Sequence, residues 1–364
     1  MRILFSTSIP YFPQHFGGIE VNLDHICRGL TARGHDVRLV ARLSPRGFTW
    51  ARNRVVKKLF GPIAFPENFN GYKVYRSFQL ERTPDLLCST FRPDIVVGHA
   101  GPEPDLLFTD LSLSRPTAIH LHGVLPLERA SRLYEIGIRN YICCSQFLKS
   151  RLLEKIPADS ALKASVIYNA FDIENYRVEP SKEFVTFINP VPQKGLRIAL
   201  ELCEALPQIP FQFVRSWPMS PLDEKRVQRL KNVRLIGPVM DMKSIYRRTR
   251  VLIVPSVGEE GAGRVITEAQ ISGIPVIGSD RGGIPETVGE GGIILRTIDV
   301  RHWIEALQTL WNNDTVWHKF SRKARQQSED FKFSYQAILK EYEAFLEACI
   351  VAHPRSRHSA YSRE

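Results

Sequence analysis

Short apolar runs alternate along the chain with longer segments in which apolar residues recur every three or four positions. Such runs are typical of strands buried in a parallel sheet, and the longer spacing is typical of helices with one buried face. Their alternation favours an α/β fold, in which helices cover both faces of a parallel sheet. The expected strands are residues 2–7, 36–41, 73–76, 94–98, 117–121, 140–144, 184–188, 211–214, 233–235, 251–254 and 275–278.

The length of the chain and a polar break near its middle predict two domains. A chain of 364 residues is long enough for about two domains. The polar stretch 178–182, which contains Pro180, is the expected boundary. We therefore expect a first domain at 1–178, a second domain at 179–335, a helix at 336–350, and a disordered basic tail at 351–364.

Composition narrows the choice of compartment and partner. No apolar run approaches the roughly 18 residues that a membrane span needs, and the six cysteines are scattered rather than paired. We therefore expect a cytoplasmic chain with reduced, buried thiols. The net charge of +11 favours an anionic partner. The candidates are phosphorylated donors, anionic lipid surfaces and nucleic acid. Nucleic acid is the least favoured of the three, because the chain has no zinc finger, helix-turn-helix or aromatic-basic RNA motif.

Residues 251–290 contain the most informative pattern in the chain. An apolar strand, a glycine-rich acidic turn, an amphipathic helix and a second strand follow one another, which predicts a βαβ unit. The amino end of its helix offers free backbone N–H groups to a phosphate. Glu260 and Glu268 flank that end with seven residues between them, and carboxylates near a phosphate are suited to binding hydroxyl groups. The stretch thus predicts a site for a nucleotide sugar.

The same stretch resembles a known family. The hallmark E-x-F-G-x-x-x-x-E-A of the retaining glycosyltransferases of family 4 stands here from Glu260 to Ala269, with Ala262 at the aromatic position. The flanking segments 255–256, 273–276 and 282–286 also match the family. The resemblance implies the GT-B architecture, in which two Rossmann-like domains with parallel sheets face one another across a cleft. It places the donor on the second domain and the acceptor on the first, and it returns the helix 336–350 to the first domain.

The resemblance also implies the roles of individual residues. Glu260, His122 and Lys194 are the implied catalytic residues, and Glu268 is the implied ribose ligand. The loop Gly17-Gly18 matches the family's G-G-x-E motif, whereas Pro190 stands where relatives carry a phosphate-binding arginine. The residues expected to bind the donor are Gly17, Gly18, Lys194, Gly261, Ala262, Gly263, Arg264, Val265 and Glu268.

The implied reaction is transfer of a hexose from a UDP- or GDP-linked sugar to a glycan, a lipid-linked or a small-molecule hydroxyl, with retention of configuration and without a metal ion or other cofactor. Two alternatives stay open. Pro190 and Ala262 favour a catalytically silent subunit that binds nucleotide sugars. A non-hydrolysing sugar-nucleotide epimerase shares the architecture. The donor base, the sugar, the acceptor and the oligomeric state are left open by the sequence.

Two further features have more than one interpretation. Residues 43–65 interleave basic and apolar side chains, which fits either a solvated helix with one core face or peripheral binding to the inner face of a membrane. His99, His120 and His122 follow the ends of predicted strands, where open α/β sheets bind their ligands. Their spacing fits no common zinc motif and no acidic partner is evident, so no metal site is expected.

Overall fold

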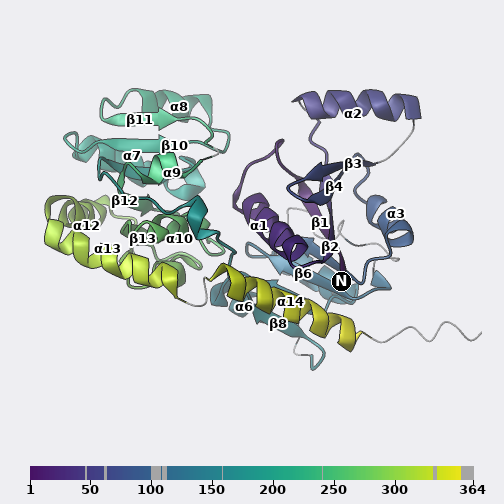
Figure 1. Ribbon diagram of the computed structural model, residues 1–364. Helices are drawn as coiled ribbons and strands as arrows, with labels where there is room; N and C mark the ends of the chain where they lie inside the picture. The colour runs from purple at the N-terminus through teal and green to yellow at the C-terminus, as the bar shows by residue number, and fades with distance from the viewer. Residues whose placement is uncertain are drawn as a thin grey trace, which may run out of the picture.

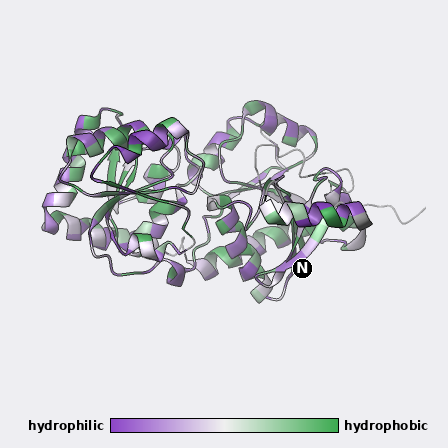
Figure 2. Cartoon of the chain, turned by 90° about the horizontal axis from the view of Figure 1, so that it is seen from above, coloured by the Kyte–Doolittle hydropathy of each residue, from purple (hydrophilic) through white to green (hydrophobic). Residues whose placement is uncertain are grey.

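The computed structural model describes residues 1–45, 47–60, 64–99, 108, 113–157, 159–239, 241–330 and 334–353. The chain forms two α/β domains that lie side by side (Figure 1). Hydrophobic residues concentrate in the strands and polar residues on the outer faces of the helices (Figure 2). The predicted α/β class, with two Rossmann-like domains, is confirmed.

The first domain contains an eight-stranded sheet. Its strands are β1 (Arg2–Pro10), β2 (Asp36–Arg42), β3 (Ala64–Phe69), β4 (Tyr72–Ser77), β5 (Ile95–His99), β6 (Thr117–Leu121), β7 (Asn140–Cys143) and β8 (Lys163–Val166). They lie in the order β3-β4-β2-β1-β5-β6-β7-β8. All neighbouring pairs are parallel except β3 with β4, which are antiparallel. The expected strands left out both edge strands of this sheet, β3 and β8. Strand β3 carries Pro66 and polar residues instead of an apolar run.

The second domain contains a six-stranded, fully parallel sheet. Its strands are β9 (Phe184–Ile188), β10 (Phe211–Val214), β11 (Val233–Ile236), β12 (Thr249–Val254), β13 (Val276–Ser279) and β14 (Gly292–Leu295). They lie in the order β11-β10-β9-β12-β13-β14. The chain thus winds outward in one direction from β9 and in the other from β12. Ligands of such sheets bind beyond the carboxyl ends of the strands at this reversal point.

Helices cover both faces of the two sheets. Those formed by the first half of the chain are α1 (Gly18–Ala32), α2 (Gly47–Phe60), α3 (Thr83–Thr90), α5 (Leu127–Glu135), α6 (Gln146–Leu153) and the 3₁₀ turn η2 (Ile173–Asn175). Those of the second half are η3 (Pro192–Lys194), α7 (Leu196–Ala205), α8 (Pro221–Gln228), α9 (Lys243–Tyr246), α10 (Arg264–Ile271), α11 (Ile284–Val288), α12 (Val300–Asn312), α13 (Asp314–Glu329) and α14 (Tyr335–Ala352).

The last helix, α14, packs on the first sheet rather than on the second, as its position beneath the first domain shows (Figure 1). Tyr342 and Leu346 share an apolar cluster with Ile3 and Phe5 of β1. Leu4, between them in sequence, belongs to the cluster on the other face, because side chains alternate across a strand. Most of the predicted tail, residues 354–364, lies outside the described residues.

All six cysteines are buried and free, in agreement with the expected reduced thiols. No helix among the described residues is both long enough and apolar enough to cross a membrane. Of the basic segment 43–65, residues 47–60 form α2, while Arg46 and residues 61–63 lie outside the described part of the chain.

Candidate active site

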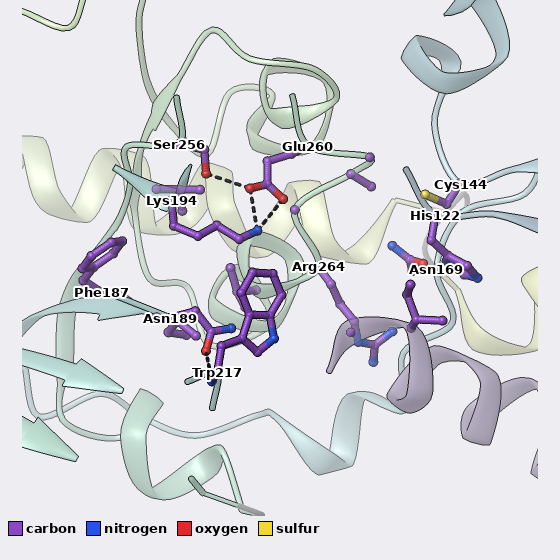
Figure 3. A pocket seen from close by; sticks show the side chains of 18 of the residues that line it. His122, Cys144, Asn169, Phe187, Asn189, Lys194, Trp217, Ser256, Glu260 and Arg264 are labelled. Carbon is purple, nitrogen blue, oxygen red and sulfur yellow. Dashed lines mark hydrogen bonds and ion pairs between the residues drawn. The ribbon is translucent and has the colours of Figure 1, made fainter. Parts of the chain in front are cut away.

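A cavity of about 250 Å³ lies between the two domains, beyond the carboxyl ends of β1, β6, β9 and β12 (Figure 3). Both domains line it, so the reversal points of the two sheets face one ligand space. Most of the predicted site residues line this cavity together: Gly18, His122, Lys194, Glu260, Gly261, Ala262, Gly263, Arg264 and Val265. Gly17 lies immediately before it as the N-cap of α1.

Two helix amino ends converge on the cavity, one from each domain. Helix α1 begins after Gly17 and α10 begins after Gly263, and neither glycine supplies a side-chain cap. The first backbone N–H groups of both helices therefore lack intrahelical partners. Gly263 has a φ of 65°, a left-handed conformation that glycine adopts without strain. The arrangement concentrates partial positive charge from two helix dipoles at one place, which suits a polyanion.

Lys194 and Glu260 form an ion pair inside the cavity (Figure 3). The Lys194 Nζ lies 2.5 Å and 2.7 Å from the two carboxylate oxygens, and the Ser256 hydroxyl donates to Oε1 over 2.8 Å. The ammonium also lies 5.0 Å from the ring centre of Trp217. The ion pair therefore holds together two of the three side chains that the resemblance implies to be catalytic.

Asn189 lies just before Pro190, the position at which the family resemblance implied an arginine. Its side-chain oxygen accepts hydrogen bonds from the backbone N–H groups of Ser216 and Trp217, over 2.9 Å and 3.0 Å. The loop after β9 thus fixes the loop after β10 and turns Trp217 toward the cavity. Trp217 also lines an adjoining space of about 500 Å³, together with His15.

Several cavity residues were not predicted from the sequence as site residues. These residues are Ile19, Cys144, Asn169, Phe187, Ile188, Asn189, Trp217, Ile253, Val254 and Ser256. The signal that could have found the polar ones is their position directly after predicted strands, at the sheet edge where ligands bind.

Arg264 and Glu268 are bound to each other one turn apart on α10. The Arg264 Nε lies 3.1 Å from Glu268 Oε1, and the Tyr246 hydroxyl donates to Oε2 over 2.8 Å. The Arg264 guanidinium also donates to the Ala170 carbonyl over 2.9 Å and to the Tyr176 hydroxyl over 3.1 Å. Its charge is therefore directed at the first domain. Glu268 is 6% exposed and does not line the cavity, so its ribose role stays a prediction.

Close backbone contact joins the domains beside the cavity. A Cβ placed on Gly261 would lie 2.2 Å from the His122 carbonyl oxygen, so only glycine fits there without movement. The Ser145 hydroxyl donates to the Gly261 carbonyl over 2.6 Å. The Glu286 carboxylate accepts from the backbone N–H groups of Gln146 and Phe147, over 3.0 Å and 3.3 Å, at the amino end of α6.

Three imidazoles gather at the cavity wall: His122 lines the cavity, and His99 and His120 are fully buried behind it. Their candidate ligand atoms lie within 4.8 Å of one another, so the set is the one group among the described residues that could hold a metal ion. The rings pack against one another, with centres 4.2 to 5.0 Å apart. Burial lowers the pKa of all three, and the nearby Arg264 charge also lowers that of His122, to about 3. The imidazoles are therefore neutral at pH 7.

Two family models match the chain. A model of glycosyltransferase family 4 matches residues 16–175, and a model of glycosyl transferases group 1 matches residues 183–313. Together they cover most of both domains. The chain belongs to the group 1 glycosyltransferases. The family suggested by the segment from Glu260 to Ala269 is thereby confirmed.

Individual relatives agree with this assignment. An uncharacterized glycosyltransferase of Methanocaldococcus jannaschii is 26% identical over 292 residues, which are 75% of this chain and 79% of the relative. O-antigen chain mannosyltransferase C of Escherichia coli is 22% identical over 353 residues, which are 88% of this chain and 91% of the relative.

Solved structures share the fold at low identity. Anabaena HepE in complex with UDP and glucose has a TM-score of 0.74 and 17% identity, over 96% of this chain and 100% of that one. Sucrose-phosphate synthase of Thermosynechococcus elongatus has a TM-score of 0.74 and 16% identity, over 97% and 100%. These likenesses establish the GT-B fold of this glycosyltransferase.

Proposed function

We propose that this glycosyltransferase moves a sugar from a nucleoside diphosphate sugar to a hydroxyl acceptor, with retention of configuration and without a metal ion. The observation that carries the proposal is the convergence of two uncapped helix amino ends and Lys194 on one interdomain cavity. This is the charge distribution that a diphosphate requires. The Anabaena structures with UDP and UDP-glucose share the fold and favour the same class of donor.

The proposed chemistry is electrostatic. As the bond between the sugar and the diphosphate breaks, negative charge grows on the departing phosphate oxygens. Lys194 and the N–H groups around Gly263 stabilise that charge, and they are already in place before the reaction. This fixed positive charge does what a bound metal ion would otherwise do, so the proposed mechanism needs no metal ion.

The remaining roles follow from position. Glu260 is proposed to accept hydrogen bonds from hydroxyl groups of the donor sugar, once the phosphates draw Lys194 away from it. Glu268 is proposed to bind the ribose after releasing Tyr246. The acceptor is proposed to bind on the first-domain side of the cavity, next to the space that lies between His15 of the first domain and Trp217 of the second. Its chemical class, a glycan or a lipid-linked or small-molecule hydroxyl, is not decided by these residues.

The donor proposal is tested by thermal unfolding with UDP, GDP, ADP and their sugars, because a ligand that binds the native state raises its Tm. We expect one nucleotide series to raise the Tm of the wild type. Lys194→Ala removes a charged hydrogen bond worth about 1.5–3 kcal/mol and should weaken binding of that nucleotide by about 10- to 100-fold. Isothermal titration calorimetry measures the change.

The matched control is Lys323→Ala, which removes an exposed lysine that pairs with Glu290 on the surface of the second domain. Its nucleotide affinity should equal that of the wild type. Equal affinity in the Lys194 variant would refute the phosphate role. Incubating the wild type with the donor then separates the alternatives, since a silent subunit consumes no donor and an epimerase forms epimers without any acceptor.

We also infer that α2 is a peripheral membrane contact. Phe48 is 82% exposed and Val55 is 59% exposed, and the two lie on one side of the helix. Arg54 and Lys58 are exposed beside them, whereas Asn53 on the opposite side is buried. Exposed apolar side chains bordered by cations suit an anionic lipid surface. Helix α2 stands at the outer edge of the first domain, clear of the second (Figure 1).

A further inference from the structure

His99 lies directly behind His122, which lines the cavity. His99 is the last residue of β5, is fully buried, and is aligned with His120 in the register of β5 and β6. Its Nδ1 is 2.9 Å from the Nε2 of His122. The two rings are nearly parallel, with an angle of 26° and a centre distance of 5.0 Å. A sheet position therefore holds one imidazole against another at hydrogen-bond distance.

The hydrogen bond between two neutral imidazoles can run in either direction, and the two directions have different consequences. The His99 Nε2 is buried and has no hydrogen-bond partner among the described residues. If His122 donated, His99 would carry its own proton on that Nε2 and leave a buried N–H unpaired. If His99 donates from Nδ1, its Nε2 is an unpaired acceptor instead. Unpaired buried N–H groups are the rarer and costlier outcome, so donation by His99 is favoured.

Donation by His99 fixes the proton of His122. With its Nε2 accepting, a neutral His122 must carry its proton on Nδ1. That Nδ1 has no hydrogen-bond partner among the described residues and is not one of the buried unpaired atoms. It is therefore not fully buried, and the ring that carries it belongs to a residue that lines the cavity. The Arg264 charge nearby disfavours a second proton on the ring.

We propose that His99 is a positioning residue, which holds His122 in the Nδ1–H tautomer and thereby makes it a neutral hydrogen-bond donor toward the ligand. The role of His122 toward a sugar donor rests on the proposed function. The tautomer itself does not, because it follows from the contact between the two rings. A group of this kind donates to a sugar or phosphate oxygen but does not take a proton from the acceptor.

The test measures the tautomer directly. Long-range ¹H–¹⁵N correlation spectra of histidine-labelled protein distinguish protonated from unprotonated ring nitrogens at pH 7. In the wild type we expect the proton of His122 on Nδ1. His99→Asn places an amide donor near the original Nδ1 and should keep that pattern. His99→Phe fills the space without a donor and should give a mixture of the two tautomers.

Turnover gives a second readout. Misplacing a group that contacts the substrate costs up to about 100-fold, so His99→Phe should lower kcat by at least about tenfold and His99→Asn should restore most of the loss. UDP or GDP affinity should change little in both variants. If no nucleotide sugar is turned over, the proposed function fails, while the spectra still decide the tautomer.

Three results would overturn the proposal. One is a wild-type His122 with its proton on Nε2. Another is a His99→Phe variant with an unchanged His122 pattern. The third is a rise in Tm on adding Zn²⁺ that His99→Asn abolishes, since the three imidazoles would then be metal ligands. If His99→Phe does not fold, as circular dichroism will show, the wild-type spectrum and His99→Asn decide the question.

Discussion

At the residue scale, the missing side chain of Gly261 determines how closely the domains approach. Its Cα faces the His122 carbonyl across the cavity edge, and the Ser145 hydroxyl donates to the carbonyl of Gly261 itself. Sequence reasoning found Gly261 only as part of a phosphate-binding turn. It could not find the contact with His122, because that contact forms between positions more than a hundred residues apart.

Gly261→Ala tests this contact. The added methyl group must push the His122 backbone away, and overpacking of this kind costs about 1–3 kcal/mol. We expect nucleotide-sugar affinity to fall by about tenfold while the circular dichroism spectrum stays that of a folded protein. Gly123→Ala is the control, because a Cβ there meets nothing within 4 Å. Equal losses in both variants would contradict the prediction.

The candidate site was predictable where chemistry is carried by local motifs. Lys194, Glu260 and the turn before α10 line one cavity, as the family resemblance implied. Trp217 was not assigned to the site, because it reaches the cavity only through the hydrogen bonds that Asn189 makes to its loop. The ion pair between Lys194 and Glu260 was also missed, since it depends on the folding of two separate loops.

At the element scale, apolar runs located the central strands well, whereas the edge strands β3, β8 and β14 were not among the expected strands. A central parallel strand such as β12 is buried on both faces and therefore reads as a continuous apolar run. The edge strand β3 is buried only in part and carries Pro66, so no such run exists. Helix α2 was predicted, but its orientation was not, because either of its faces could have been the buried one.

The orientation of α2 makes its membrane role testable. Arg54→Glu with Lys58→Glu should weaken sedimentation with phosphatidylserine vesicles by at least about tenfold, since each cation near an anionic surface contributes about 1 kcal/mol. Lys319→Glu with Arg322→Glu on α13 makes the same change in net charge at another exposed place and should change binding less. Wild-type protein that stays in solution with these vesicles at low salt would rule out the membrane contact.

At the scale of the whole molecule, buried neutral histidines make stability depend on pH. Burial lowers the pKa of His25 and His122 to about 3, and it also lowers those of His99 and His120. In the unfolded chain a histidine has a pKa of about 6.5. Below that pH the unfolded state binds more protons than the folded state, so the free energy of unfolding falls as the pH is lowered.

Between pH 6.5 and pH 4, each such histidine should add up to about 1.4 kcal/mol per pH unit to the slope of the free energy of unfolding against pH. Urea unfolding at a series of pH values measures the total slope. His120→Phe removes one of these groups. It should reduce the slope by up to about 1.4 kcal/mol per pH unit, the contribution of one bound proton. His302→Gln, which removes an exposed histidine instead, is the variant for comparison. An unchanged slope in the His120 variant would show that this ring is protonated in the folded state.

The amino end of α6 has a consequence for motion of the whole molecule. Glu286, which belongs to the second domain, accepts hydrogen bonds from two backbone N–H groups of this helix in the first. When the domains separate, these two N–H groups lose the Glu286 carboxylate and must bond to water instead. No residue of the first turn of α6 replaces that acceptor. The exchange of the Gln146 and Phe147 amide hydrogens with solvent therefore reports how often the cleft opens.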